Sequence, residues 1–318
     1  MIQGAGIRTW FAGSHMKPTI FIHTNEKQII GALVSKYSFE RFATDPTAFD
    51  VKLIHTDDHP FFAQYEGREY LRSRLTRRWS NRDLQSFTVL RFMPPELMAY
   101  QGRSVVVDPD VFCVSDIMPL LTRDMNGKAI MARRRGAASS KLFATSVMLL
   151  DNARLQHWHV ERDFAELFAF KRDYADWIDL RLEPPDSIAV LENVWNDFDR
   201  LTPETRLVHN THRRTQPWKT GLTVDFRPAE TGSLSLANLF HRARRSIFGE
   251  YGLLGHYRKH PDANQERLFF ALLKECVEQG IVTKAMLDRE MRLNHVRHDA
   301  LDILARTPTL TEQPLLAS

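Results

Sequence analysis

Short apolar runs alternate with helical patterns between Thr19 and Val208, and this alternation constrains the fold more than any other feature. Short apolar runs rich in β-branched residues predict buried strands. Five such runs are residues 19–23, 51–55, 104–107, 129–132 and 145–150. Residues 29–42 have helical spacing, and a second helix is expected to begin at Pro94. Strands alternating with helices predict an α/β fold with a largely parallel sheet.

Two carboxylates, Asp108 and Asp110, directly follow the strand predicted over residues 104–107. The intervening Pro109 holds Asp108 in extended backbone, because a residue before proline avoids the helical region. In extended backbone, residues i and i+2 point to the same side, so the two carboxylates lie together at a strand end. Such a pair favours a divalent cation that also binds a substrate phosphate. The alternative is an exposed turn, since Asp-Pro-Asp is also common turn chemistry.

The composition fits one enzyme-sized domain with an addition at its C-terminus. The chain has 318 residues, of which 43% are hydrophobic and 26% charged. We expect a main domain over residues 17–228, a helical region with a pair of amphipathic helices over 229–306, and loose termini at 1–16 and 307–318. Two distant cysteines exclude a disulfide framework and a thiolate metal cluster. With no secretory signal and no long apolar run in the sequence, a cytoplasmic location is expected.

The net charge of +4 makes the chain mildly basic. This charge suits an anionic small ligand or a membrane surface, but it is too weak to indicate nucleic acid, for which the sequence carries no RRM, KH or zinc signature. Residues 240–248 form a basic amphipathic stretch. They are expected either to rest on anionic lipid headgroups or to pack their apolar side on the main domain. The short length of the stretch favours packing.

Four segments in chain order carry further information. They are residues 87–97, which include Arg91; residues 105–117, with Asp108-Pro-Asp110 followed by Asp116-Ile117; residues 143–151, Phe-Ala-Thr-Ser-Val-Met-Leu-Leu-Asp; and residues 207–218, Leu-Val-His-Asn-Thr-His-Arg-Arg-Thr-Gln-Pro-Trp. Together they resemble the motifs of the family-8 retaining glycosyltransferases, the group that contains glycogenin and bacterial lipooligosaccharide galactosyltransferases. The resemblance covers about residues 18–221, roughly two thirds of the chain.

The resemblance implies a GT-A fold: a Rossmann-like, mixed and mostly parallel sheet flanked by helices, here with a C-terminal helical appendage. It also implies a nucleotide-sugar donor and a Mn²⁺ ion held by Asp108, Asp110 and His209, with Mg²⁺ as the alternative cation. Carboxylate and imidazole ligands together suit Mn²⁺ better. His212 competes with His209, but an apolar pair leads straight into His209 as a strand end would.

The same resemblance assigns binding roles to other residues. Arg91 would bridge the diphosphate and the sugar, for which its planar fork is suited; a surface arginine is the alternative. His23, Thr24 and Asn25 follow the first strand, where the family contacts uracil and ribose, although Thr24 or Asn25 could equally cap the next helix. Trp218 is expected to be a lid or core aromatic beside the nucleotide.

The sequence departs from the family pattern at three places. Gln216 stands where the family has a lysine before Pro-Trp, so Lys219, Arg213 or Arg214 would supply charge to the leaving group. The family's Asn-Ser-Gly is Ala-Thr-Ser at residues 144–146, which removes an amide near the sugar. Asp176 is the expected acceptor-side catalytic residue, but the glutamine that should follow it is a tryptophan.

The sequence therefore predicts a hexosyltransferase that moves a hexose from a UDP-sugar to a hydroxyl of a carbohydrate or lipid-linked glycan. The predicted reaction is Mn²⁺-dependent and, by the resemblance, retaining. No nucleic-acid partner is expected, and the basic C-terminal helices offer peripheral contact with the inner face of a membrane. The alternatives are a nucleotidyltransferase on a similar sheet and a non-catalytic module that binds nucleotide-sugars or polyanions.

Overall fold

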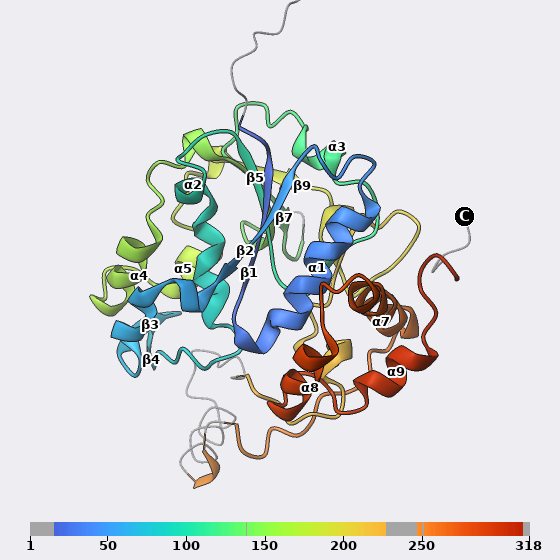
Figure 1. Ribbon diagram of the computed structural model, residues 1–318. Helices are drawn as coiled ribbons and strands as arrows, with labels where there is room; N and C mark the ends of the chain where they lie inside the picture. Colours follow the sequence, from blue (N-terminus) through green and yellow to red (C-terminus); the bar gives the residue numbers. More distant parts are fainter. Residues whose placement is uncertain (1–15, 138, 227–246, 250, 314–318) are drawn as a thin grey trace, which may run out of the picture.

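A six-stranded sheet forms the centre of the computed structural model, which describes residues 16–137, 139–226, 247–249 and 251–313 (Figure 1). The strand order is β2-β1-β5-β8-β7-β9, and β8 runs antiparallel to β5 and β7 while the other pairs are parallel. The strands are β1 (Thr19–Thr24), β2 (Asp50–His55), β5 (Arg103–Val107), β7 (Ile130–Arg134), β8 (Phe143–Asp151) and β9 (Ile188–Leu191). The predicted α/β fold with a mixed, mostly parallel sheet is confirmed.

Two small sheets and the edge strand β9 were not expected from the sequence. One small sheet contains β6 (Val111–Cys113), β10 (Asp197–Phe198) and β11 (Leu207–His209), and the other is a hairpin of β3 (Glu69–Arg72) and β4 (Leu75–Arg78). The hairpin turns at Ser73 and Arg74, which both have positive φ angles, 53° and 62°. Such turns usually contain Asn-Gly, so this one leaves no recognisable signal in the sequence.

Helices cover both faces of the central sheet (Figure 1). The helices with described bounds are α1 (Ile29–Phe42), α2 (Pro94–Leu97), α3 (Met118–Leu121), α4 (Val160–Phe168), α5 (Tyr174–Ile178), α7 (Ala263–Glu278), α8 (Lys284–Arg292) and α9 (Ala300–Arg306), of which the last three pack against α1 rather than on the sheet. The 3₁₀ helix η4 (Ser86–Phe92) carries Arg91. The predicted helix over residues 29–42 is confirmed as α1.

The two faces of the sheet bury separate cores. Side chains alternate along a strand, so Ile20 and Ile22 pack with α1 and α3 on one face, while Phe21 packs with α4 and α5 on the other. Every residue of β1 is buried, as expected of a strand covered by helices on both sides. This double burial explains the unbroken apolar runs in the sequence.

The C-terminal helices share a core with the main domain rather than forming a separate unit. Residues 263–306 form three helices, α7 to α9, where a pair was expected from the sequence. Residues of α7 pack with Val34 of α1 and with Trp218, and Tyr37 donates a hydrogen bond to Glu275 at 2.9 Å. The predicted boundary at residue 228 therefore does not separate two cores; residues 227–246 themselves lie outside the described residues.

The expectation of a loose end from residue 307 onward is wrong for residues 307–313. Leu310 is buried, and its backbone N–H donates to Glu275 Oε1 at 3.0 Å. Residues 1–15 and 314–318, also predicted to be loose, lie outside the described residues. None of the helices in the described parts of the chain has the length and apolar composition that a membrane crossing requires.

Candidate functional site

The site lies at the edge of the sheet where β1 and β5 end. Because β8 runs antiparallel to β5, its first residues reach the same edge, with Val107 opposite Val147. The backbone N–H of Asp108 donates to Ser146 O at 3.0 Å, which joins the Asp-Pro-Asp turn to β8. Helix α1 approaches this turn closely: a Cβ atom on Gly31 would lie 2.9 Å from Pro109 O. Glycine is therefore required at this position for the helix to pack against the turn.

The structure brings the three predicted metal ligands together. One ligand atom from each of Asp108, Asp110 and His209 lies within 4.8 Å of the other two, and all three residues are buried. His209 Nε2 is 3.3 Å from Asp110 Oδ1 and 3.9 Å from Asp108 Oδ2. Ligand atoms on one divalent cation are roughly 3 to 4 Å apart, since each metal–ligand bond is on the order of 2 Å. The three side chains are thus spaced as a metal site requires.

Strand pairing brings His209 to the aspartates. The antiparallel pairing of β11 with β6 sets His209 opposite Val111, one residue beyond Asp110. The imidazole Nδ1 is 2.9 Å from Asn196 Oδ1, and Asn196 Nδ2 donates to Ser146 Oγ at 3.0 Å. With Nδ1–H donating to the amide oxygen, Nε2 keeps its lone pair toward the carboxylates, as a metal ligand must.

Asp110 is oriented by a buried pair of glutamines. Gln216 Nε2 donates to Asp110 Oδ2 at 2.9 Å, and Gln28 Nε2 in turn donates to Gln216 Oε1 at 3.2 Å. Gln216 is the residue that replaces the family's lysine. Here it leaves Asp110 Oδ1 facing His209 and acts on the carboxylate rather than on a leaving group.

Asp108 is held by two cationic or cation-forming side chains. Arg91 Nε donates to Asp108 Oδ1 at 2.9 Å and Arg91 Nη2 contacts Oδ2, while His23 Nε2 lies 2.9 Å from Oδ1. Burial acts to raise the pKa of Asp108, but Arg91 and then His23 hold that pKa well below its usual range. Burial lowers the pKa of His23. Burial also acts to lower the pKa of His209, but the negative charges of Asp110 and then Asp108 raise that pKa overall.

An irregularity in β8 aims two hydroxyls at this cluster. The pairing of β7 with β8 shifts between Ala132 and Arg133, so that residues 145–147 of β8 have no partner on β7. Thr145 Oγ1 accepts from Arg91 Nη1 at 2.8 Å, and Ser146 Oγ accepts from Asn196. Bulges often redirect side chains next to active sites. The Ala-Thr-Ser departure therefore supplies hydroxyl contacts around Arg91 and His209.

The cluster opens into a cavity of about 470 Å³, which we call the metal cavity. Its walls come from η4, β8, α5, β11 and the turn of the β3–β4 hairpin. Four arginines and three aspartates line it, an excess of one positive charge before any cation binds; they are Arg72, Arg91, Arg135, Arg213, Asp108, Asp110 and Asp179. An anionic ligand suits this cavity, and more so with a divalent cation present.

The other predicted site residues lie away from the surface of the metal cavity. His23 and Thr24 are fully buried and Asn25 nearly so; the Asn25 side chain donates to the backbone of residues 83 and 84. None of the three side chains lines the metal cavity. His212 is exposed and hydrogen-bonds Thr215, so it does not compete with His209.

Lys219 and Trp218 serve the core rather than the cavity. Lys219 is fully buried and donates to Asp225 Oδ2 at 3.1 Å, so the predicted charge on a leaving group is not offered there. Of the three candidates for that role, Arg213 lines the metal cavity. Trp218 is fully buried and stacks on Phe269 of α7, which makes it a core aromatic rather than a lid.

Asp176 lies on the other side of α5 from the metal cavity. It lines a second cavity and pairs with Arg181 at 3.0 Å. Asp179, three residues later, lines the metal cavity instead. Sequence reasoning missed Asp179 and Asn196; the only signal for Asn196 was a polar residue next to Trp195 in an otherwise ordinary loop.

No family model matches this sequence, and no curated protein matches it closely enough to count as a relative. Among solved structures, the chain is similar to the glycosyltransferase GlyE of Streptococcus pneumoniae, with 15% identity over 84% of this chain and 64% of that one and a TM-score of 0.46. It is similar to the galactosyltransferase LgtC, with 12% identity over 63% of this chain and 89% of that one and a TM-score of 0.46. It is also similar to mouse xyloside xylosyltransferase 1, with 14% identity over 61% of this chain and 97% of that one and a TM-score of 0.42. The chain thus spans 64% of the length of GlyE.

Proposed function

We propose that this protein is a metal-dependent glycosyltransferase of the GT-A type, which transfers a hexose from a UDP-sugar to an acceptor hydroxyl. The observation that carries the proposal is the convergence of Asp108, Asp110 and His209 in a cavity with excess arginine. All four sequence segments that resemble family-8 enzymes contribute residues to this one cluster, although they are spread over more than a hundred residues of chain.

The residues present fit a divalent cation. Two carboxylate oxygens and one imidazole nitrogen form a mixed donor set, which favours Mn²⁺ over Mg²⁺. Each ligand has a partner that fixes its orientation: Arg91 and His23 for Asp108, Gln216 for Asp110, and Asn196 for His209. When bound, the cation would act as a Lewis acid toward the diphosphate and offset charge on the departing UDP.

The chain's own arginines account for the remaining charge. Arg91 uses three of its five N–H donors on Asp108 and Thr145, which fixes its guanidinium at the cavity wall. Arg72 and Arg213 line the same cavity and face the space beside the aspartates. Fixed positive charge of this kind binds the diphosphate and stabilises negative charge that grows on the leaving group. The acceptor hydroxyl would attack the anomeric carbon, with retention as in the family that the sequence resembles.

UDP release from a panel of UDP-sugars, with Mn²⁺ and without acceptor, tests the proposal. We expect slow release by the wild type, no release by Asp110→Ala, and a rate roughly 10² to 10³ lower for Arg91→Ala. If no UDP-sugar gives release above the Asp110→Ala background, the proposal of an enzyme fails. Binding that then falls steeply with salt and ignores Mn²⁺ would favour the polyanion-binding module instead.

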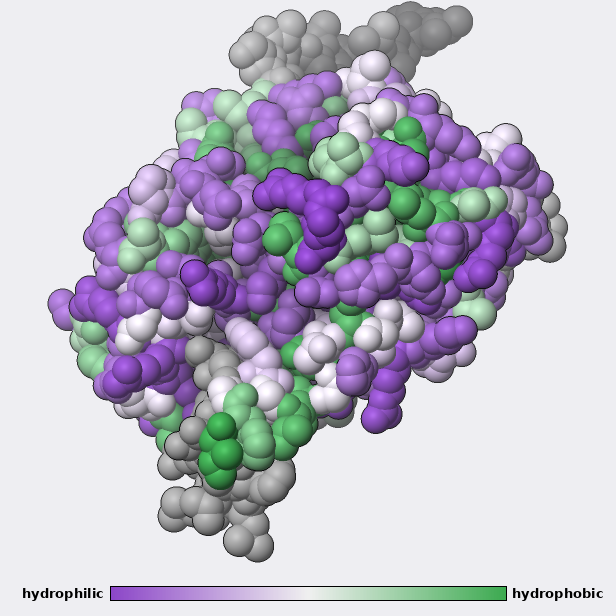
Figure 2. Space-filling view, turned by 60° about the horizontal axis from the view of Figure 1, so that its bottom comes forward, coloured by the Kyte–Doolittle hydropathy of each residue, from purple (hydrophilic) through white to green (hydrophobic). Residues whose placement is uncertain are grey.

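Membrane contact is proposed for the end of the molecule near residues 247–253. Ile247 and Leu253 are each 71% exposed and Phe248 is 53% exposed, so these residues do not pack on the main domain. Figure 2 shows apolar surface beside the residues drawn in grey at this end of an otherwise mostly hydrophilic face. Residues 240–246, which carry the basic charges of this stretch, lie outside the described residues. Phe248→Glu should reduce co-sedimentation with vesicles that contain phosphatidylglycerol; unchanged co-sedimentation would contradict the contact.

A further inference from the structure

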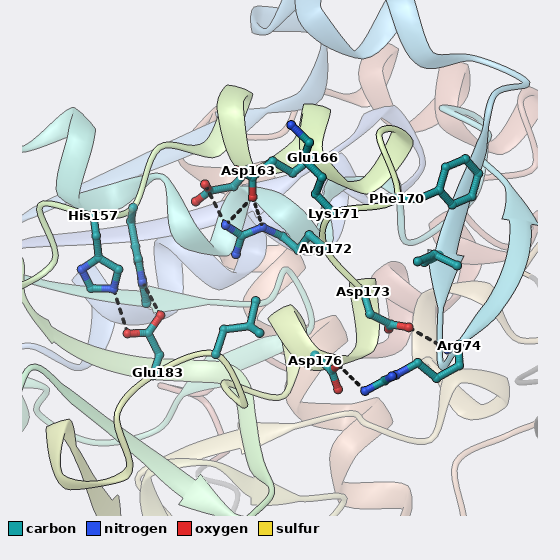
Figure 3. A pocket seen from close by; sticks show the side chains of 13 residues that line it. Arg74, His157, Asp163, Glu166, Phe170, Lys171, Arg172, Asp173, Asp176 and Glu183 are labelled. Carbon is teal, nitrogen blue, oxygen red and sulfur yellow. Dashed lines mark hydrogen bonds and ion pairs between the residues drawn. The ribbon is translucent and has the colours of Figure 1, made fainter.

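A second cavity, of about 530 Å³, lies on the far side of α5 from the metal cavity. Figure 3 shows the side chains that line it. The two cavities share their dividing wall. Tyr174 and Ile178 of α5 line the metal cavity, whereas Asp173 and Asp176, from the same short segment, line the second one. The hairpin turn divides in the same way, because Ser73 lines the metal cavity and Arg74 the second.

The carboxylates of the second cavity already accept hydrogen bonds. Glu183 accepts from Trp158 Nε1 at 2.8 Å and contacts His157 at 2.9 Å, as Figure 3 shows on one side of the cavity. Asp163 accepts from Arg172 Nη2 at 3.0 Å. Asp173 accepts three backbone N–H groups, those of residues 73, 74 and 175. The carboxylates therefore attract a free cation weakly, but the oxygens of Asp176 and Glu183 keep lone pairs that can accept a further hydrogen bond.

Ionic ligands of the other sign are also disfavoured here. Five carboxylates and three Lys or Arg side chains line the second cavity, so its formal charge is −2, with His157 neutral. Arg162 and Arg181 pair with Asp163 and Asp176 from outside the lining, so the second cavity lacks the excess positive charge that suits the metal cavity to a phosphate or nucleotide. A neutral ligand with many hydroxyl groups fits best, because its hydroxyls can donate to Asp176 and Glu183 and accept from Arg172.

Apolar groups stand at the rim of the second cavity. Phe170 and Leu182 line it, and each is 49% exposed. Phe170 also has a φ angle of +57°, which is uncommon for a bulky side chain and costs backbone energy. Ligands that combine hydroxyl groups with apolar ring faces are saccharides, and an exposed ring at a polar cavity offers such a face a contact surface.

We propose that the second cavity binds a carbohydrate, namely the sugar units of the acceptor glycan that lie beyond the reacting hydroxyl. The role as an acceptor site rests on the proposed glycosyltransferase function, but the binding of a neutral saccharide does not depend on metal or nucleotide. A glycan that spans the wall of α5 has its reactive end in the metal cavity and its distal sugars against Phe170 and Leu182. The second cavity therefore selects the acceptor rather than the donor.

Saturation-transfer difference NMR on the full chain, without metal or nucleotide, tests this proposal. The probes are maltotetraose, cellotetraose and triacetylchitotriose. We expect at least one probe to receive saturation in the wild type, and the Phe170→Ala/Leu182→Ala double variant to lower its affinity roughly ten-fold, because two apolar contacts are lost. Leu97→Ala is the matched control, since Leu97 is also 49% exposed but lines neither cavity.

Two outcomes overturn the proposal: none of the three probes receives saturation, or the double variant binds as well as the wild type. Thermal unfolding of the double variant checks that the fold is kept, as expected for two half-exposed side chains. Calorimetry of the wild type with UDP and Mn²⁺ separates the two proposals. Oligosaccharide binding without UDP binding contradicts the glycosyltransferase, whereas UDP binding without any oligosaccharide contact contradicts the second cavity.

Discussion

The metal cavity and the second cavity share a wall but differ in charge and in how their polar groups are used. In the metal cavity, cationic side chains exceed carboxylates, and His209 Nε2 faces Asp108 and Asp110 at 3.9 and 3.3 Å. Among the residues that line the second cavity, carboxylates exceed cations, yet every carboxylate already accepts a hydrogen bond. The first arrangement is suited to an anion with a cation, and the second to a neutral polar ligand. The five-residue helix α5 separates the two cavities, because its side chains line one cavity on one side and the other cavity on the opposite side.

The largest expected effect separates the cavities by metal dependence. Asp110→Ala removes one of three ligands, so Mn²⁺-dependent UDP affinity should fall by more than about 100-fold in calorimetry. Saccharide binding in the second cavity should stay unchanged in the same variant. Asp58→Ala, which removes an exposed carboxylate outside both cavities, is the matched control. Equal UDP affinity in Asp110→Ala and wild type would contradict the claim that metal and UDP bind in the metal cavity.

A second prediction tests whether Lys219 acts in the core or on the leaving group. Burial lowers the pKa of Lys219 against the opposing effect of Asp225, as expected for a buried ion pair. Asp225→Asn leaves the ammonium group without its charged partner and should cost about 3 kcal/mol of unfolding free energy in urea. Lys219→Met, which removes the buried charge, should be better tolerated and should leave UDP release intact. A Lys219→Met variant that is stable but releases UDP much more slowly would restore the leaving-group role.

A third prediction concerns Asn196, which orients His209. Asn196→Ala should weaken Mn²⁺ binding by about 10- to 100-fold, because a ligand without its orienting partner loses its preferred tautomer and rotamer. Asn196→Asp, which still accepts from Nδ1–H, should retain more of the affinity. Titration of Mn²⁺ by electron paramagnetic resonance measures both without any turnover. If Asn196→Ala and Asn196→Asp bind Mn²⁺ alike, the contact to His209 has no positioning role.

The smallest expected effect concerns Asp173, in the wall between the cavities. Burial acts to raise the pKa of Asp173, but hydrogen bonds from the backbone of Arg74, Ser73 and Ala175 lower it overall. A lowered folded-state pKa stabilises the protein above the unfolded value of roughly 3.9, and this stabilisation is lost as the pH falls through the folded value. Asp173→Asn should therefore cost about 1 kcal/mol at pH 7 and flatten the loss of stability below pH 4.

A rescue variant checks the reason for that effect. Asp173 stabilises a hairpin turn whose two central residues both have positive φ, so Ser73→Asn/Arg74→Gly should recover stability in the Asp173→Asn background. Recovery is read as the midpoint of thermal unfolding. Without recovery, strain in the turn is not what Asp173 offsets.

Sequence reasoning succeeded where the signal is local. Buried strands leave continuous apolar runs, so they were predicted. The two aspartates were predicted to lie together, but in extended backbone; they lie in a turn instead, in which Val111 N–H donates to Asp108 O at 3.2 Å. His209 was favoured over His212 because of the two apolar residues before it, and the strand β11 ends there. These features depend on neighbours along the chain, which a single sequence displays.

Sequence reasoning failed where burial is decided by distant parts of the chain. Nothing near Lys219 indicates that α7 and the segment around Asp225 enclose it. Asn25 was assigned to a ligand, but its amide is used by a loop almost sixty residues away. The sequence did not indicate the second cavity, because its charged residues come from the β3–β4 turn, α4, α5 and the loops that flank α5. Taken singly, they resemble an ordinary solvated surface.

Anomalous diffraction from crystals grown with UDP and Mn²⁺ tests the central claim most directly. The account predicts one manganese peak with bonds on the order of 2 Å to Asp108, Asp110 and His209, and UDP phosphate oxygens on the same ion. The second cavity, on the far side of α5, is expected to hold no manganese. A peak that lacks any of these three ligands, or UDP bound away from it, would contradict the metal site and the function built on it.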